Sequence, residues 1–198
     1  MKYGELTLGQ VEAVVNKLGG MEGVKRFLVG EMVISEAERK FKTWKTIKLG
    51  TGPKTADEFR HLLCDGEFRL NDWASDILGN PAFKEADEET EIDLVKVTVA
   101  ELDFKDGARR DQIYERAQKL GLELCPAEVG PQLRLQYQDQ PNGEWVLVAM
   151  EPIFDSVGDP GIFFVGRDDS GLWLNGHWSN PDYFWIADDQ WLFCRPRK

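Results

Sequence analysis

The chain has 198 residues, of which 42% are hydrophobic and 30% are charged, and its net charge is −11. This length suits one domain or two small ones. The 7 Trp, 4 Tyr and 11 Phe residues exclude a disordered low-complexity protein, because they supply enough apolar surface to offset the entropy lost on folding. No apolar run approaches the roughly 20 residues that cross a bilayer, so we expect no membrane segment.

The charge is unevenly distributed along the chain. Residues 1–54 carry a net charge of +4, whereas residues 55–198 carry −15. An acidic body repels nucleic acids and anionic membranes over about a Debye length, ~8 Å at physiological salt. Neither is therefore expected as a general partner, and the basic N-terminal quarter is the one local exception.

The cysteines and the N-terminus indicate a cytoplasmic protein. The first residues contain no apolar core of the kind that a secretory signal requires. Cys64, Cys125 and Cys194 are odd in number and widely spaced, which argues against a disulfide framework or a zinc site. We expect three reduced thiols, most of them buried.

The start of the chain predicts two short helices. Thr7 begins an amphipathic helix over residues 7–18 with a capping box. Gly19-Gly20 ends this helix, and a second apolar stripe follows over residues 21–28. We therefore predict that residues 1–30 form a helical hairpin module.

The middle of the chain predicts further helices with one or two strands. Thr55 and Asn71 stand at the starts of two helical patterns as N-cap residues. Caps, turns and apolar spacing together predict strands over 43–49 and 92–99 and helices over 55–63, 72–78 and 108–120.

The C-terminal part predicts strands. Apolar and polar residues alternate over residues 133–138, and the turn Pro141-Asn142-Gly143 leads into a second run over residues 145–150, which is typical of a β-hairpin. Further strands are predicted over 162–165, 172–174, 183–186 and 191–194. We therefore predict an α+β domain over residues 31–198, with an antiparallel β-meander from about residue 131.

Aromatic residues are dense in this predicted meander. Strand alternation distributes them over both faces of the sheet, and only one face needs to pack on the helices. The other face then exposes aromatic side chains rimmed by acids, a composition typical of interfaces and ligand grooves, unless the chain covers that face too. We predict a non-enzymatic cytosolic interaction protein that binds a protein or a small ligand there. The predicted partner-binding residues are Trp173, His177, Trp178, Tyr183, Trp185, Asp168 and Asp169.

The basic segment offers an alternative function. Five cations are interleaved with aromatic residues there, as in surfaces that bind single-stranded nucleic acid. The residues that would carry this function are Arg39, Lys40, Lys42, Trp44, Lys45 and Lys48. The competing interpretation is that this strand lies beside the acidic body and offsets its self-repulsion.

A third interpretation is a small hydrolase, with His177 and either Asp168 or Asp169 as acid–base groups. No glycine-rich segment has the spacing of a phosphate-binding loop. The segment 155–159 resembles a calcium loop in composition, but it lacks the EF-hand spacing and the final glutamate. We therefore predict no metal site and no cofactor.

Several segments resemble an uncharacterised family of bacterial hypothetical proteins. They are Leu18–Gly20, Phe27–Leu28, Thr43–Thr51, Asp72–Gly79, Leu122–Gly130 and Leu133–Tyr137. The resemblance covers most of the chain and implies a bacterial, cytoplasmic protein. It implies no activity, so no functional residue is carried over from it.

Overall fold

A computed structural model describes residues 7–32 and 41–196 of the chain. The chain divides into two compact units, residues 1–38 and residues 39–198. The sequence predicts this boundary after residue 30, and the structure has it after Glu38.

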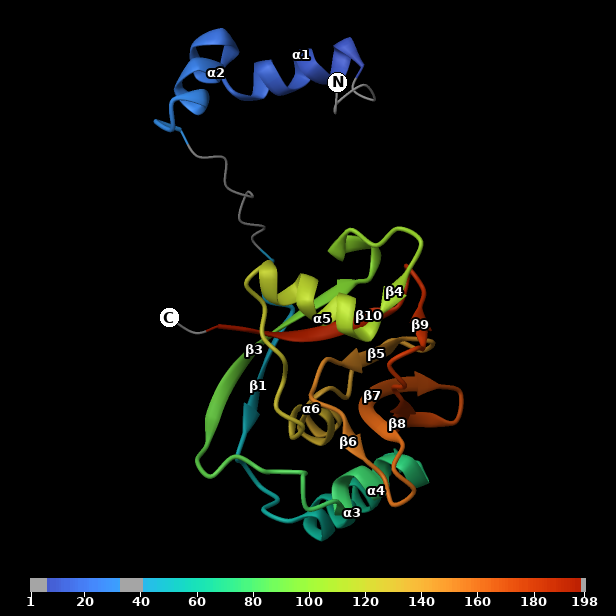
Figure 1. Ribbon diagram of the computed structural model, residues 1–198. Helices are drawn as coiled ribbons and strands as arrows, with labels where there is room; N and C mark the ends of the chain where they lie inside the picture. Colours follow the sequence, from blue (N-terminus) through green and yellow to red (C-terminus); the bar gives the residue numbers. More distant parts are fainter. Residues whose placement is uncertain (1–6, 33–40, 197–198) are drawn as a thin grey trace. The chain divides into compact units, whose positions relative to one another are not determined.

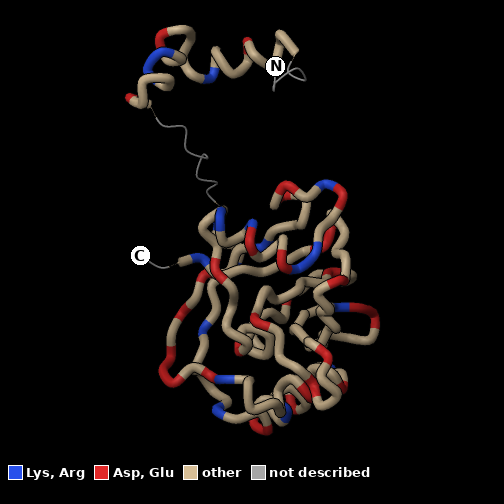
Figure 2. Tube along the Cα trace, in the orientation of Figure 1, with Lys and Arg blue, Asp and Glu red and all other residues tan. Residues whose placement is uncertain are grey.

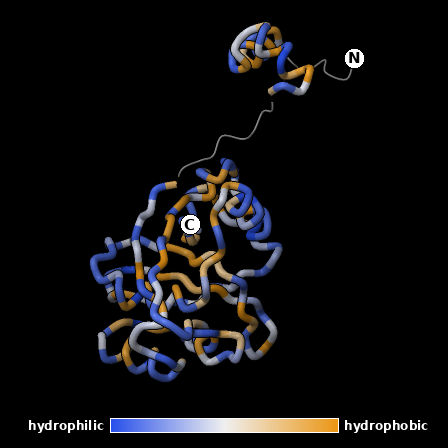
Figure 3. The backbone as a smooth tube through the Cα atoms, turned by 90° about the vertical axis from the view of Figure 1, so that its left-hand side faces the viewer, coloured by the Kyte–Doolittle hydropathy of each residue, from blue (hydrophilic) through white to orange (hydrophobic). Residues whose placement is uncertain are grey.

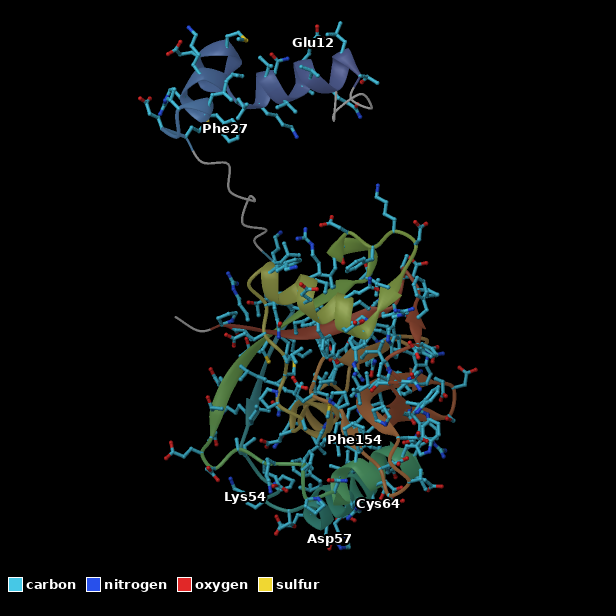
Figure 4. All side chains as sticks on the ribbon, in the orientation of Figure 1. Glu12, Phe27, Lys54, Asp57, Cys64 and Phe154 are labelled. Atoms are coloured by element: carbon cyan, nitrogen blue, oxygen red, sulfur yellow. The ribbon has the colours of Figure 1, made fainter. Side chains whose placement is uncertain are left out.

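The N-terminal unit contains two short helices, α1 (Leu8–Lys17) and α2 (Gly20–Leu28) (Figure 1). The Thr7 hydroxyl accepts a hydrogen bond from the Gln10 N–H at 3.3 Å, and the Thr7 N–H donates to Gln10 Oε1 at 2.8 Å. This confirms the predicted capping box. Neither helix buries a side chain in the described part of this unit, and Phe27, labelled in Figure 4, is 40% exposed.

The larger unit is built on a mixed eight-stranded sheet. The strand order is β1 (Lys45–Leu49), β3 (Thr90–Thr98), β10 (Gln190–Arg195), β5 (Trp145–Val148), β7 (Pro160–Asp168), β8 (Gly171–Trp178) and β2 (Arg69–Leu70), and β6 (Ile153–Phe154) pairs with β7. The β10–β5 and β2–β8 pairs are parallel and the other pairs are antiparallel. A separate two-stranded ladder joins β4 (Ala108–Arg109) to β9 (Phe184–Trp185).

Helices cover both faces of this sheet (Figure 1). They are α3 (Ala56–Asp65), α4 (Asp72–Gly79), α5 (Arg110–Lys119) and α6 (Val129–Gln136), with a short 3₁₀ helix, η1, at Ala100–Leu102. We call the face of the sheet that packs on α6 and α4 the inner face, and the opposite face the outer face. On the inner face, Phe163 and Gly176 lie opposite each other in the β7–β8 ladder; Phe163 packs against α6 and Gly176 against α4. The outer face carries Trp191, whose ring contacts Tyr114 of α5. The fold is therefore α+β, as predicted.

In the segment predicted as a strand over residues 133–138, residues 133–136 are helical instead, as the end of α6. Alternation predicts a strand because polar residues are assumed to face water. Here Gln132 and Arg134 are buried and are hydrogen-bonded to protein oxygens, among them the carbonyls of Thr51 and Gly166. Arg134 of this segment is therefore polar and buried, whereas Gln136 and Gln138 are exposed, and the predicted hairpin from this segment to β5 is wrong.

The C-terminal strands do not form a simple meander. The β7–β8 hairpin is confirmed, with eight paired positions from Gly161↔Trp178 to Asp168↔Gly171. In contrast, β10 lies between β3 and β5, and the predicted strand over 183–186 is reduced to β9, which lies outside the main sheet. The sheet is mixed because β10 pairs in parallel with β5 and β2 pairs in parallel with β8, and parallel pairs require crossover connections.

Hydrophobic residues of both strands and helices gather in the interior of the larger unit (Figure 3). Acidic residues are spread along the chain of the larger unit (Figure 2). All three cysteines are free thiols; Cys125 and Cys194 are buried and Cys64 is exposed. Among the described residues, no helix is long and apolar enough to cross a membrane.

Candidate functional site

The β7–β8 hairpin places the predicted partner-binding residues on two different faces. Successive side chains of a strand point to opposite sides. Trp173 and His177 of β8 therefore lie on the outer face, on either side of the buried Asn175. Trp178 lies on the inner face, where α4 packs. The predicted residues thus do not form one continuous surface.

On the outer face, His177 is the centre of an aromatic cluster. Its ring centroid lies 6.0 Å from that of Phe164, 5.5 Å from that of Tyr183 and 4.8 Å from that of Trp185. Tyr183 is 39% exposed, but Trp185 is only 2% exposed and packs at 4.8 Å on Trp191. The prediction of Trp185 as a partner contact is therefore corrected: its indole belongs to the core.

Hydrogen bonding fixes the orientation of the His177 ring. Its Nδ1 lies 2.6 Å from the carbonyl oxygen of Trp178. Because a carbonyl only accepts, Nδ1 is the donor of this hydrogen bond. Burial raises the pKa of the Asp189 carboxyl above its ordinary value, and the hydrogen bond that Asp189 accepts from the Ile186 N–H opposes this shift. Asp189 was not among the predicted site residues, and a turn of two aspartates was its only sequence signal.

Asp168 and Asp169 lie at the opposite end of the hairpin from His177. Asp168 Oδ1 accepts hydrogen bonds from the hydroxyl of Ser170 at 2.5 Å and from the indole N–H of Trp173 at 3.1 Å, and these bonds lower the pKa of Asp168. Asp169 accepts one from the side-chain amide of Asn142 at 2.8 Å. Six residues of extended strand span about 20 Å. The structure therefore does not bring His177 together with either aspartate as an acid–base pair.

A pocket lies beside the other end of the hairpin, between β8 and α4. Its volume is about 120 Å³, and its walls include Trp73 and Ile77 of α4, Trp178 and His177 of β8, and the loop 155–159. Trp73 is 54% exposed and Trp178 is 39% exposed. Trp73 and the loop aspartates were missed as binding residues, because nothing local says that α4 approaches this end of β8.

Gly176 allows α4 to approach β8 this closely. A Cβ atom at this position would lie 2.8 Å from the backbone nitrogen of Ala74 and from the carbonyl carbon of Trp73. We therefore expect Gly176→Ala to lower the free energy of unfolding by about 1–3 kcal/mol, because a rotamer change cannot move backbone atoms. Urea denaturation measures this. Gly9→Ala, which meets no atom within 4 Å, is the control, and an unchanged midpoint in Gly176→Ala would contradict the close packing.

The loop 155–159 shows no metal-binding geometry. Oδ1 of Asp155 accepts hydrogen bonds from the backbone N–H groups of Val157 at 2.9 Å and Asp159 at 2.8 Å, so this oxygen holds the turn. Within the described residues, no group of three or more His, Cys, Asp or Glu side chains could hold a metal ion.

The basic segment is paired with acids of its own domain where it is described. Lys45 lies 3.8 Å from Asp139, and Lys48 lies 2.8 Å from Glu89, which raises the pKa of Lys48. The Trp44 ring packs edge-on against Tyr137 at 5.1 Å, so it is not a free stacking platform. Of the other predicted residues, Lys42 is exposed, whereas Arg39 and Lys40 lie outside the described residues.

Comparisons with known proteins add no relative. The chain matches no protein-family model, no curated protein and no solved structure. The resemblance to uncharacterised bacterial proteins therefore stays a prediction.

Proposed function

We propose that this is a binding protein, and that its ligand or a side chain of its protein partner enters the pocket between α4 and β8. The observation that carries this proposal is the pocket itself, an apolar hollow with exposed indoles at Trp73 and Trp178 and carboxylates at its rim. Binding sites are typically concave and mostly apolar, with a few polar groups that select the ligand.

The surroundings of His177 favour binding over hydrolysis. The nearest serine in the sequence, Ser179, is buried; its hydroxyl accepts a hydrogen bond from Arg110 at 2.7 Å and donates to the carbonyl of Pro160 at 3.3 Å. This hydroxyl therefore serves to connect α5 with the ends of β7 and β8. The free thiols and the acidic domain support the cytoplasm as the place of action.

The proposal treats the N-terminal unit separately from the unit that contains the pocket. We regard α1 and α2 as a helical hairpin module whose apolar side chains need a covering surface, since α1 buries no residue and α2 buries only Gly23. An isolated hairpin of this size is marginally stable in water.

The proposal predicts that Trp178→Ala removes binding without unfolding the protein. Trp178 is 39% exposed, so we expect the melting temperature to fall by no more than about 2 °C. Titration of ¹⁵N-labelled protein with small fragments and short peptides should shift the indole N–H signals of Trp73 and Trp178 in the parent protein. The same ligands should cause no shift at Trp73 in the variant.

Trp145→Ala is the matched control for this experiment. Trp145 is 40% exposed, lies on β5 and does not line the pocket. Its replacement should leave ligand shifts at Trp73 and Trp178 intact. A large drop in melting temperature for Trp178→Ala would show that Trp178 is a core residue, and ligand shifts elsewhere with none at the two indoles would overturn the proposed site.

A further inference from the structure

We propose that the pocket between α4 and β8 selects an organic cation, namely an ammonium group on a short alkyl chain. This inference rests on the proposed function and adds the chemical class of its ligand. It stands on three features of the pocket: two indole walls, two free carboxylate groups at the rim, and an apolar floor.

The indole walls suit a positively charged guest. Trp73 comes from α4 and Trp178 from the end of β8, and both line the same space. Trp73 is 54% exposed and Trp178 is 39% exposed, so part of each indole is open to a ligand. The face of an aromatic ring carries partial negative charge, and tryptophan attracts cations most strongly of the aromatic side chains.

The carboxylates of Asp155 and Asp159 at the rim keep oxygens that no other described group uses. Asp155 uses Oδ1 for the turn, and its Oδ2 has no hydrogen-bond partner among the described residues. The Asp159 carboxylate is exposed and makes neither a hydrogen bond nor an ion pair with another described side chain. No Lys or Arg lines the pocket. The remaining ionisable side chain of the lining is that of His177. The two carboxylates attract a cation, and the net charge of −15 over residues 55–198 acts in the same direction.

The apolar floor selects an organic cation over a metal ion. The side chains of Ile77 and Val157 line the pocket beside the aspartates and carry no oxygen, whereas Ca²⁺ requires about 6–8 oxygen ligands. Buried apolar contact instead stabilises a hydrocarbon chain. A cavity of about 120 Å³ is several times the roughly 10–15 Å³ that one water molecule needs, so it has room for the end of a short alkylammonium.

Two pairs of probes test the charge requirement. The first pair is n-butylammonium and 1-butanol, a free amine and its neutral analogue. The second is N-acetyl-lysine N-methylamide and N-acetyl-norleucine N-methylamide, which present the same groups as side chains of a protein. Each is titrated into the full-length protein at low salt while the indole signals of Trp73 and Trp178 are followed. We expect each cation to bind about tenfold more tightly than its neutral partner.

Asp155→Asn/Asp159→Asn removes both charges and keeps the Oδ1 acceptor that holds the turn. In this variant we expect cation affinity to fall about tenfold, to the level of the neutral probe, with the neutral probe unchanged. The matched control is Asp87→Asn/Glu88→Gln, which removes two exposed charges that do not line the pocket. If the double variant fails to fold, Asp159→Asn alone replaces it, since this carboxylate holds no backbone group.

The possible outcomes separate the two proposals. Equal binding of a cation and its neutral partner, abolished by Trp178→Ala, would overturn the cation inference and leave the binding site standing. No indole shift with any of the four probes would overturn both. Binding of butylammonium but not of capped lysine would support the cation and assign the site to free amines, whereas binding of both would extend it to lysine side chains of a partner.

Discussion

Replacing Glu128 with alanine is expected to lower the free energy of unfolding by about 3–5 kcal/mol. Glu128 is fully buried, and its two carboxylate oxygens accept hydrogen bonds from three donors: the N–H of Gly50 at 2.8 Å, the N–H of Ala86 at 2.7 Å and the side-chain amide of Gln132 at 3.0 Å. These donors come from three separate segments. Alanine leaves all of them buried without an acceptor, at about 1–3 kcal/mol each before relaxation.

Thermal denaturation checks this expectation, since about 3–5 kcal/mol corresponds to a fall of about 6–20 °C for a unit of this size. Glu128→Gln should lie between the alanine variant and the parent, because its amide nitrogen would face one of the donors. Glu115→Ala, which removes an exposed carboxylate paired with Lys119 at 2.5 Å, should change stability by no more than about 0.5 kcal/mol. If Glu128→Ala melted with the parent, Glu128 would not hold these segments together.

Replacing Arg134 with alanine is expected to cost about 3–5 kcal/mol as well. The guanidinium is fully buried in α6, and burial lowers its pKa to about 10, so it is still charged at neutral pH. It donates to Gln140 Oε1 at 2.6 Å, to the carbonyl of Gly166 at 3.3 Å and to the carbonyl of Tyr137. Its removal leaves these acceptors unpaired and opens a cavity beside Phe68, whose ring lies 5.4 Å from the guanidinium.

Hydrogen exchange provides the specific readout for this variant. Arg134 and Gln140 together tie the segment 137–144 to β7, so amides of that segment should exchange faster than those of β3 in Arg134→Ala. Arg134→Lys should recover only part of the stability, because an ammonium group cannot reproduce the planar fork of donors. Uniform exchange throughout the domain would argue that Arg134 acts only through overall stability.

The confirmed predictions, the helix caps and the β7–β8 hairpin, depend on residues that are close together in the sequence. Side-chain oxygens of Thr7, Thr55 and Asn71 each accept the backbone N–H three residues ahead, as their helix-capping role requires. The β7–β8 hairpin follows from a four-residue turn between two apolar runs. A cap or a tight turn involves few residues, and their identities suffice to specify it.

The candidate site could be predicted only in part. The sequence singles out Trp178 and His177, and the structure places both at the pocket. It also predicts Trp185 as a partner contact, but β9 folds this residue onto Trp191 and buries it. Composition indicates that aromatic residues gather in one region, but which of them face water depends on where other segments pack.

The α+β class, the helix caps and the hairpin that carries Trp178 are thus predictable from the amino-acid order alone. The tertiary structure alone decided that residues 129–136 form a helix, because the burial and hydrogen bonding of Gln132 and Arg134 override their polar pattern. It also decided the strand order and the pocket, since α4 reaches β8 only across about a hundred residues of chain, at a glycine with no side chain to keep it away. Interactions between residues close in the sequence determine helix caps and tight turns. Packing between distant segments determines which polar groups are buried and which surfaces meet.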